Sequence, residues 1–138
     1  MYPGGVRAWA IAACLACAAP ASVAKAPVAP PAPAPPRPED EAKAALRLFA
    51  TSVREGEWPR AFSLLSSRWR ARLNPELLAA DWQAAGPVGA RALSRVEALL
   101  ASGARVHAQG RVATLAVGEG RTASLILEDG QWHVDALE

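Results

Sequence analysis

The stretch Leu125–Leu137, LILEDGQWHVDAL, predicts a β-hairpin and with it the class of the fold. Aspartate followed by glycine at 129–130 is a strong two-residue turn signal, because both residue types tolerate positive φ. Apolar residues alternate with polar ones after the turn, which puts Trp132 and Val134 on the same side of one strand. We therefore expect two antiparallel strands in this stretch.

Further strands are expected upstream of the hairpin, where apolar residues recur with a period of two. Arg121–Leu127 alternates clearly, and Arg105–Val117 alternates with Gly110 as a bulge or bend. Arg91–Leu100 is the remaining strand candidate, although its alanine and leucine content also fits a short helix. The residues expected to face the core from the last two strands are Ala123, Leu125, Leu127, Trp132, Val134 and Ala136.

Three helices are expected before the strands, because the apolar period there is 3.6 residues. The first begins at Pro38, where three acidic residues follow, and ends at Gly56. The second begins at Pro59, and the third runs from Asn74 to Gly86. The apolar residues of the three helices are Leu46, Phe49, Ala50, Val53, Ala61, Phe62, Leu65, Trp69, Leu77, Leu78 and Trp82, with arginines 68, 70 and 72 expected in solvent.

This order of elements predicts an α+β fold in which three N-terminal helices pack on one face of a curved antiparallel sheet of about four strands. The domain is expected to span residues 39–138. It carries 12 basic and 13 acidic residues, which leaves no positive footprint for nucleic acid.

Residues 1–24 have the pattern of a secretory signal, with Arg7 before the uncharged apolar run Ala8–Ala19. That run of 12 residues is shorter than the roughly 20 needed to span a bilayer. Both cysteines, Cys14 and Cys17, lie inside it, so their C-x-x-C spacing does not indicate a redox or zinc site. Two interpretations stay open: signal peptidase removes both cysteines, or one of them carries a lipid anchor.

A proline-rich spacer occupies residues 25–38, with seven prolines in the 13 residues from Ala26 to Pro38. Such a tract favours polyproline II and would extend about 40 Å. A spacer suits a domain tethered to a membrane, and a tail of a secreted protein is the alternative. We therefore expect an exported protein, either a lipoprotein at the outer membrane or the periplasmic side, or a soluble periplasmic or secreted domain.

Three stretches together resemble a known superfamily: REGEWPRAFSLLS (54–66), WRARLNPELLAADW (69–82) and LILEDGQWHVDAL (125–137). They are similar to the cystatin-like roll of the nuclear transport factor 2-like superfamily, in particular to its bacterial exported lipoprotein-type domains. The residues that match the closing strand of those domains are Asp129, Gly130, Trp132, Val134 and Asp135. The resemblance covers residues 39–138 and concerns fold, because this fold hosts isomerases, dehydratases, binding modules and spacers.

The resemblance implies a cone-shaped pocket between the sheet and the helices. Members that resemble ketosteroid isomerase use an aspartate base there, with a tyrosine and a protonated acid as the oxyanion hole. The only tyrosine of this sequence is Tyr2, in the leader. That catalytic set therefore does not map onto the chain, and no catalytic residue is assigned.

Five residues are candidates for a pocket or a partner surface. Asp81 and Trp82 are expected at the pocket mouth, near the end of the third helix. His133 and Asp135 lie two residues apart on one strand, so both should face solvent or a partner, where Asp135 would orient His133 as a base or a pH sensor. His107 is expected on that side or in the pocket. We expect no metal site and no cofactor.

The sequence favours a non-enzymatic envelope domain that binds a protein partner or a small apolar ligand, or that serves as a structural module. The alternative is a pocket enzyme of the isomerase or dehydratase type, with Asp81 or His107 as the base. A homodimer through the outer face of the sheet is a third hypothesis, and it would place His107 and His133 at the interface.

Overall fold

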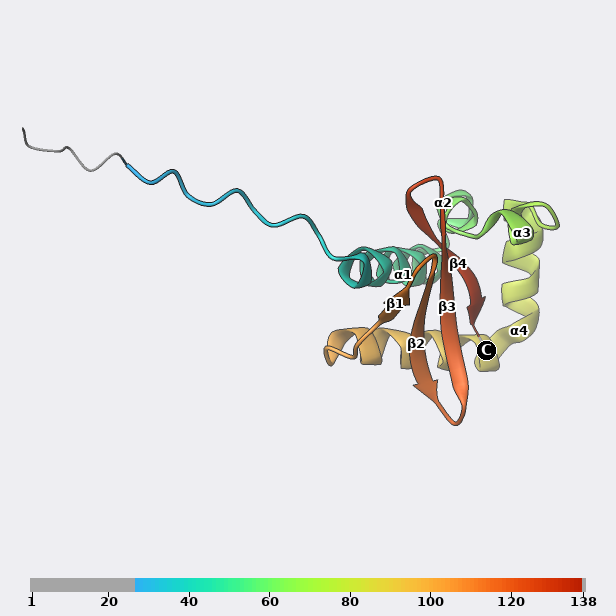
Figure 1. Cartoon of the computed structure of the whole chain (residues 1–138). Coiled ribbons are helices and arrows are strands. Elements are labelled where there is room, and N and C mark those ends of the chain that lie inside the picture. The colour runs from blue at the N-terminus through green and yellow to red at the C-terminus, as the bar shows by residue number, and fades with distance from the viewer. Residues whose placement is uncertain (1–26, 138) are drawn as a thin grey trace, which may run out of the picture. The chain divides into compact units, whose positions relative to one another are not determined.

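The computed structural model describes residues 27–137, in which four helices precede four strands (Figure 1). The helices are α1 (Pro38–Glu55), α2 (Trp58–Ser63), α3 (Ser67–Arg70) and α4 (Pro75–Ala101), and the strands are β1 (His107–Gln109), β2 (Val112–Gly118), β3 (Arg121–Glu128) and β4 (Gln131–Leu137). The strands form one antiparallel sheet in the order β1-β2-β3-β4. The α+β class and the four-stranded meander are confirmed. The leader and both cysteines lie outside the described residues.

Helix α1 begins and ends as the sequence predicts. Pro38 occupies its first turn, and the acidic residues that follow it interact favourably with the positive end of the helix dipole. Gly56 ends the helix with φ of 73°, a left-handed conformation that glycine adopts at low cost. Its buried face consists of Ala42, Leu46, Phe49, Ala50, Ser52 and Val53, and all of these except Ser52 belong to the hydrophobic core.

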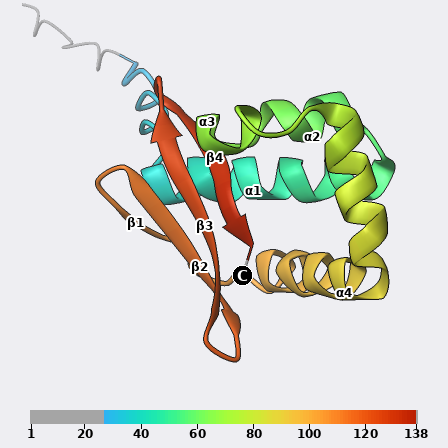
Figure 2. The same cartoon turned by 90° about the vertical axis from the view of Figure 1, so that its right-hand side faces the viewer.

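The prediction that the third helix stops at Gly86 was wrong. The chain kinks there, with φ of 50° and ψ of −129°, and α4 then continues to Ala101 in a new direction (Figures 1 and 2). Pro87 follows the kink, where the loss of one backbone donor costs little. Residues 91–100 are therefore helical, and their alanines and leucines give them high helix propensity. Their buried residues, Leu93, Val96 and Leu100, recur at helical spacing.

The prediction of one long strand over Arg105–Val117 was also wrong. The chain turns back at Gly110, which has φ of 61°, so that Gln109 of β1 pairs with Val112 of β2. Gly110 is thus a turn residue and not a bulge inside a strand. As a result β1, at one edge of the sheet, is only three residues long.

The second predicted helix is divided into α2 and α3 by a segment that runs beside β4. Leu65 in this segment forms an isolated parallel bridge with Val134. The Ser66 N–H donates to the Val134 carbonyl at 2.9 Å, and the Val134 N–H donates to the Leu64 carbonyl at 2.8 Å. The segment therefore covers the β4 edge of the sheet, which would otherwise carry unpaired backbone groups.

The inward positions of the last two strands match the prediction except at Ala136. Leu125 pairs with Val134, but Ser124 pairs with Ala136, so Asp135 is an extra residue at a β-bulge. One extra residue reverses the side on which every later residue lies. Leu137, and not Ala136, therefore pairs with the fully buried Ala123.

All four helices lie on one side of the sheet, as Figure 2 shows. Helix α1 contacts α2, α4, β1 and β4, and α4 contacts β2, so the hydrophobic core lies between the helices and the inner face of the sheet. The outer face carries no helix in the part of the chain that the structure describes, and Val112 on it is 47% exposed. Among residues 27–137 no helix has the length and hydrophobicity that crossing a membrane requires.

Candidate functional site

An apolar cavity of about 200 Å³ opens beside the C-terminal end of β4. We call it the β4 cavity. Its walls come from α1, α3, α4 and β4, and its lining residues are Phe49, Leu65, Trp69, Leu73, Leu78, Asp81, Trp82, Val134, Asp135, Ala136 and Leu137. Most of these side chains are apolar, and three of them are aromatic. Such a lining suits an apolar molecule more than a polar one.

The position at which α4 begins determines which of its residues line the β4 cavity. The Asn74 side chain accepts a hydrogen bond from the Leu77 N–H at 2.7 Å, which caps the helix directly before Pro75. Leu78 and Trp82 are then four residues apart, so they lie on one face of α4 and both line the cavity. Asp81 lines it beside them but remains exposed.

The β4 side of the cavity is held by hydrogen bonds from the α3 segment, because the bulge leaves Asp135 free of a strand partner. The Ser66 hydroxyl donates to the Asp135 carboxylate at 2.7 Å. Arg68 donates to the same carboxylate at 3.1 Å and to the Asp135 carbonyl at 3.0 Å. The Trp69 indole N–H also donates to that carbonyl. These contacts fix Trp69 as a wall of the cavity.

A second acidic residue, Glu128 at the end of β3, binds the beginning of α3. Its carboxylate accepts from the Ser67 N–H at 2.9 Å and from the Ser67 hydroxyl at 2.8 Å, and it pairs with Arg70 at 3.4 Å. Glu128 thus caps α3 in place of Ser66, whose hydroxyl is bound to Asp135. We call Ser66–Arg70, with Glu128 and Asp135, the α3 clasp.

The α3 clasp changes the acidity of Glu128. The hydrogen bond from the Ser67 hydroxyl lowers the pKa of Glu128 below its ordinary value of 4.5, and burial opposes this shift. The Ser67 N–H and the neighbouring His133 and Arg70 side chains lower the pKa further. The clasp therefore favours an ionised Glu128.

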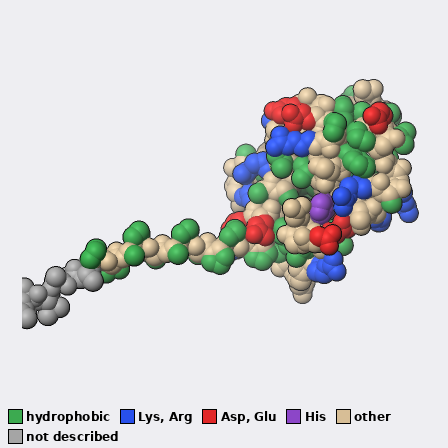
Figure 3. Space-filling model, turned by 90° about the horizontal axis from the view of Figure 1, so that it is seen from above, with side chains coloured by type: hydrophobic (Ala, Val, Ile, Leu, Met, Phe, Trp, Pro, Cys, Tyr) green, Lys and Arg blue, Asp and Glu red, His purple; other side chains and the backbone are tan. Residues whose placement is uncertain are grey.

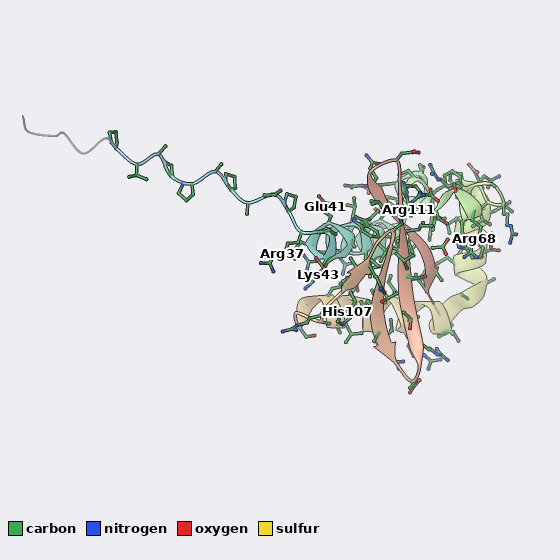
Figure 4. All side chains as sticks on the ribbon, in the orientation of Figure 1. Arg37, Glu41, Lys43, Arg68, His107 and Arg111 are labelled. Carbon is green, nitrogen blue, oxygen red and sulfur yellow. The ribbon has the colours of Figure 1, made fainter. Side chains whose placement is uncertain are left out.

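The opposite edge of the sheet has a charged hollow of about 560 Å³ beside the start of α1. Its lining residues are Arg37, Glu39, Asp40, Lys43, Gly103, Ala104, Arg105, Val106 and His107. The Lys43 ammonium donates to the Ala104 carbonyl at 3.5 Å. Figure 4 shows Arg37, Lys43 and His107 on this side, away from Arg68. Acidic and basic residues both line the hollow, so it has no single sign of charge.

Three of the five candidate residues come together at the β4 cavity: Asp81, Trp82 and Asp135 all line it. The two histidines do not belong to it. His107 is exposed on β1, and His133 is only 8% exposed on β4. The prediction that His133 faces solvent was therefore wrong, although its pairing with Ile126 puts it on the side of the sheet opposite Val134, as expected.

The pairing of His133 with Asp135 was wrong as well. Asp135 is bonded to Ser66 and Arg68, and the His133 Nδ1 atom is buried with no hydrogen-bond partner in the described part of the chain. The reason is the β-bulge, which changes the phase of the strand between the two residues. Within residues 27–137 no three metal-ligating side chains are grouped so as to hold an ion.

Several residues of this region escaped the sequence analysis. Trp69 was expected on the buried face of a longer helix, with a pocket lining as the alternative, and Arg68 and Arg70 were expected in solvent, yet these arginines pair with Asp135 and Glu128. Ser66, Ser67 and Leu73 carried no expectation for the site. The sequence did offer one indication: SSRWR at 66–70 contains two hydroxyl groups and two cations, which are complementary to the two acidic residues Glu128 and Asp135 on the last hairpin.

Acidic and basic side chains are interspersed over the face seen in Figure 3, so charge there does not single out one surface. When the chain is compared with protein-family models, curated proteins and solved structures, none of them matches. The geometry of the described residues is therefore the basis for a functional proposal.

Proposed function

We propose that this domain binds a small apolar molecule in the β4 cavity and catalyses no reaction there. The volume and lining of the cavity carry the proposal. A dry apolar cavity of about 150 Å³ is enough to hold benzene. The β4 cavity, at about 200 Å³, therefore suits one aromatic ring or a short alkyl chain.

The state of the two carboxylates at the cavity supports binding over catalysis. A general base needs a free lone pair within reach of the substrate. The Asp135 carboxylate is bound to Ser66 and Arg68. Among the described residues Asp81 has no such partner, but it is exposed to water, which a catalytic cavity excludes from the reacting groups. His107, the other base of the isomerase or dehydratase alternative, lines the hollow at the opposite edge. That alternative has less support than binding.

The resemblance to the cystatin-like roll of the nuclear transport factor 2-like superfamily stays part of the proposal. A cavity between helices and one end of an antiparallel sheet is what that resemblance implies. Export, and a lipid anchor at Cys14 or Cys17, rest on the leader and the proline tract alone. Binding of an envelope protein and homodimerisation through the sheet also stay predictions.

The proposal is tested with indole as the probe, in ¹H–¹⁵N spectra of the whole chain. We expect indole to shift amide signals of cavity residues such as Leu78 and Val134 in a saturable way. Replacing Leu73→Trp fills part of the cavity and should abolish these shifts. Leu77→Trp is the matched control, because Leu77 is 49% exposed and does not line the cavity.

Two results would contradict binding in the β4 cavity. The first is the absence of saturable shifts in the unchanged chain up to the solubility limit of indole. The second is equal binding by the unchanged chain and the Leu73→Trp variant, with Leu73→Trp shown to be folded by its spectrum.

A further inference from the structure

We propose that the ligand of the β4 cavity is an organic cation: a small molecule with an ammonium group attached to an apolar body. This inference rests on the proposed function and specifies the chemistry of the ligand. It starts from the charge of the lining, in which the two ionisable residues, Asp81 and Asp135, are both acidic.

Asp81 is the residue that supplies net negative charge. The ion pairs of the described residues include none with Asp81, whereas Asp135 is paired with Arg68 at 3.1 Å. Arg68 does not line the cavity, and its positive charge is paired with the Asp135 carboxylate. A ligand in the cavity therefore meets one uncompensated carboxylate at the rim and no cationic side chain in the walls.

The aromatic walls favour the same ligand class. Phe49, Trp69 and Trp82 line the cavity, and the face of an aromatic ring attracts cations. The Arg68 guanidinium already lies 5.4 Å from the centre of the Trp69 ring, so Phe49 and Trp82 are the lining rings that have no such contact in the described part of the chain. Rings and a carboxylate around an apolar space are complementary to an ammonium group with an apolar body, and they disfavour an anion.

The charged hollow at the opposite edge does not offer this combination. Its lining contains Arg37, Lys43 and Arg105 together with two acids, and it has no aromatic ring apart from the imidazole of His107. An organic cation would meet like charges there. Of these two hollows, the β4 cavity is therefore the one where aromatic rings and an unpaired carboxylate coincide; a third hollow, lined by Trp58 and Glu76, offers a single ring.

The test uses three probes with the same ring: benzylamine, which is cationic at pH 7, benzyl alcohol, which is neutral, and benzoate, which is anionic. Affinities are measured on the whole chain from amide shifts of cavity residues at low ionic strength. We expect benzylamine to bind about two- to fivefold more tightly than benzyl alcohol, and benzoate to bind most weakly. Added salt should reduce the advantage of the cation.

Two variants assign the effect to its residue. Asp81→Asn keeps the shape of the side chain and should remove the advantage of benzylamine over benzyl alcohol. Glu76→Gln removes the same charge from the same helix outside the cavity and should retain that advantage.

The outcomes separate this inference from the proposed function. Equal binding of benzylamine and benzyl alcohol would overturn the cation inference and leave apolar binding in place. An unchanged benzylamine advantage in Asp81→Asn would overturn the role of Asp81. Failure of all three probes to bind would overturn both proposals.

Discussion

The two edges of the sheet differ in what covers them. At the β4 edge, the segment between α2 and α3 pairs with the strand through Leu65 and is fastened by the α3 clasp. At the β1 edge, a strand of three residues borders a charged hollow, and no further strand pairs with it among the described residues. Side chains at the covered edge therefore stabilise the fold and shape a cavity, whereas those at the open edge are in contact with water.

The two histidines illustrate the difference. His133, near the covered edge, is 8% exposed and has a buried Nδ1 atom without a partner. His107, at the open edge, is exposed. Both are histidines on strands of one sheet; His133 was expected on its outer side, and His107 on that side or in the pocket. Their surroundings, and not their residue type, decide whether a solute can reach them.

The largest effect is expected from truncating the residue that bridges to β4. Leu65→Ala should lower the free energy of unfolding by about 2–5 kcal/mol, because Leu65 is 6% exposed and packs in the core. The exposed Leu77 is the matched control, and Leu77→Ala should change that free energy by less than about 0.5 kcal/mol. Urea denaturation measures both. If Leu65→Ala lowers the free energy of unfolding by less than about 1 kcal/mol, the segment between α2 and α3 contributes little to stability.

A smaller effect is expected from the clasp itself. Asp135→Ala removes the acceptor for the buried Ser66 hydroxyl and the partner of Arg68, and it should cost about 1–2 kcal/mol after allowance for solvent around Arg68. Arg95→Ala breaks the exposed pair between Arg95 of α4 and Glu119 in the turn between β2 and β3, and it should cost less than about 0.5 kcal/mol. Equal losses by urea denaturation would show that the clasp stabilises the fold no more than an exposed ion pair away from the β4 edge.

The third effect depends on pH. Because the pKa of Glu128 is lowered in the folded chain, the unfolded chain binds more protons just below pH 4.5, and stability falls as pH decreases there. Glu128→Gln should flatten this decline between about pH 5 and pH 3, as followed by urea denaturation at each pH. Asp129→Asn removes a carboxylate one residue away, outside the clasp, and is the matched control. A decline of the same slope in Glu128→Gln would contradict the role assigned to the clasp.

The smallest effect concerns the histidines and requires no change in stability. Diethylpyrocarbonate should modify His107 rapidly and His133 slowly in the native chain, as located by peptide mass spectrometry. In denaturant the two rates should converge, which controls for differences in intrinsic reactivity. Similar native rates would show that the β4 edge opens readily to solutes.

Local patterns predicted much of the fold. Asp129-Gly130 sets a hairpin turn, Pro38 and Gly56 bound α1, and Asn74-Pro75 begins α4. The wrong element boundaries arose at residues whose type is compatible with two different backbone structures. A Gly-Pro pair ends many helices, yet Gly86 and Pro87 lie at a kink inside α4. A glycine in an alternating stretch is compatible with a bulge inside one strand, yet Gly110 lies in a turn between two strands. Packing against the sheet decided between these structures.

The candidate site was predicted in part, because Asp81 and Trp82 lie on one helix whose beginning the sequence marks clearly. Trp69, Ser66 and Ser67 could not be assigned to it from spacing alone. They act through residues more than 60 positions away, Glu128 and Asp135, and local periodicity carries no information on such contacts.

The amino-acid sequence by itself determined the α+β class, the order of helices before strands and the terminal hairpin, because propensity, capping and apolar period act over a few neighbouring residues. Only the tertiary structure decided the bulge at Asp135, the burial of His133 and the position of Trp69 of α3 at the β4 cavity. These features depend on which strand edge a distant segment covers, and that choice follows from packing the whole core at once.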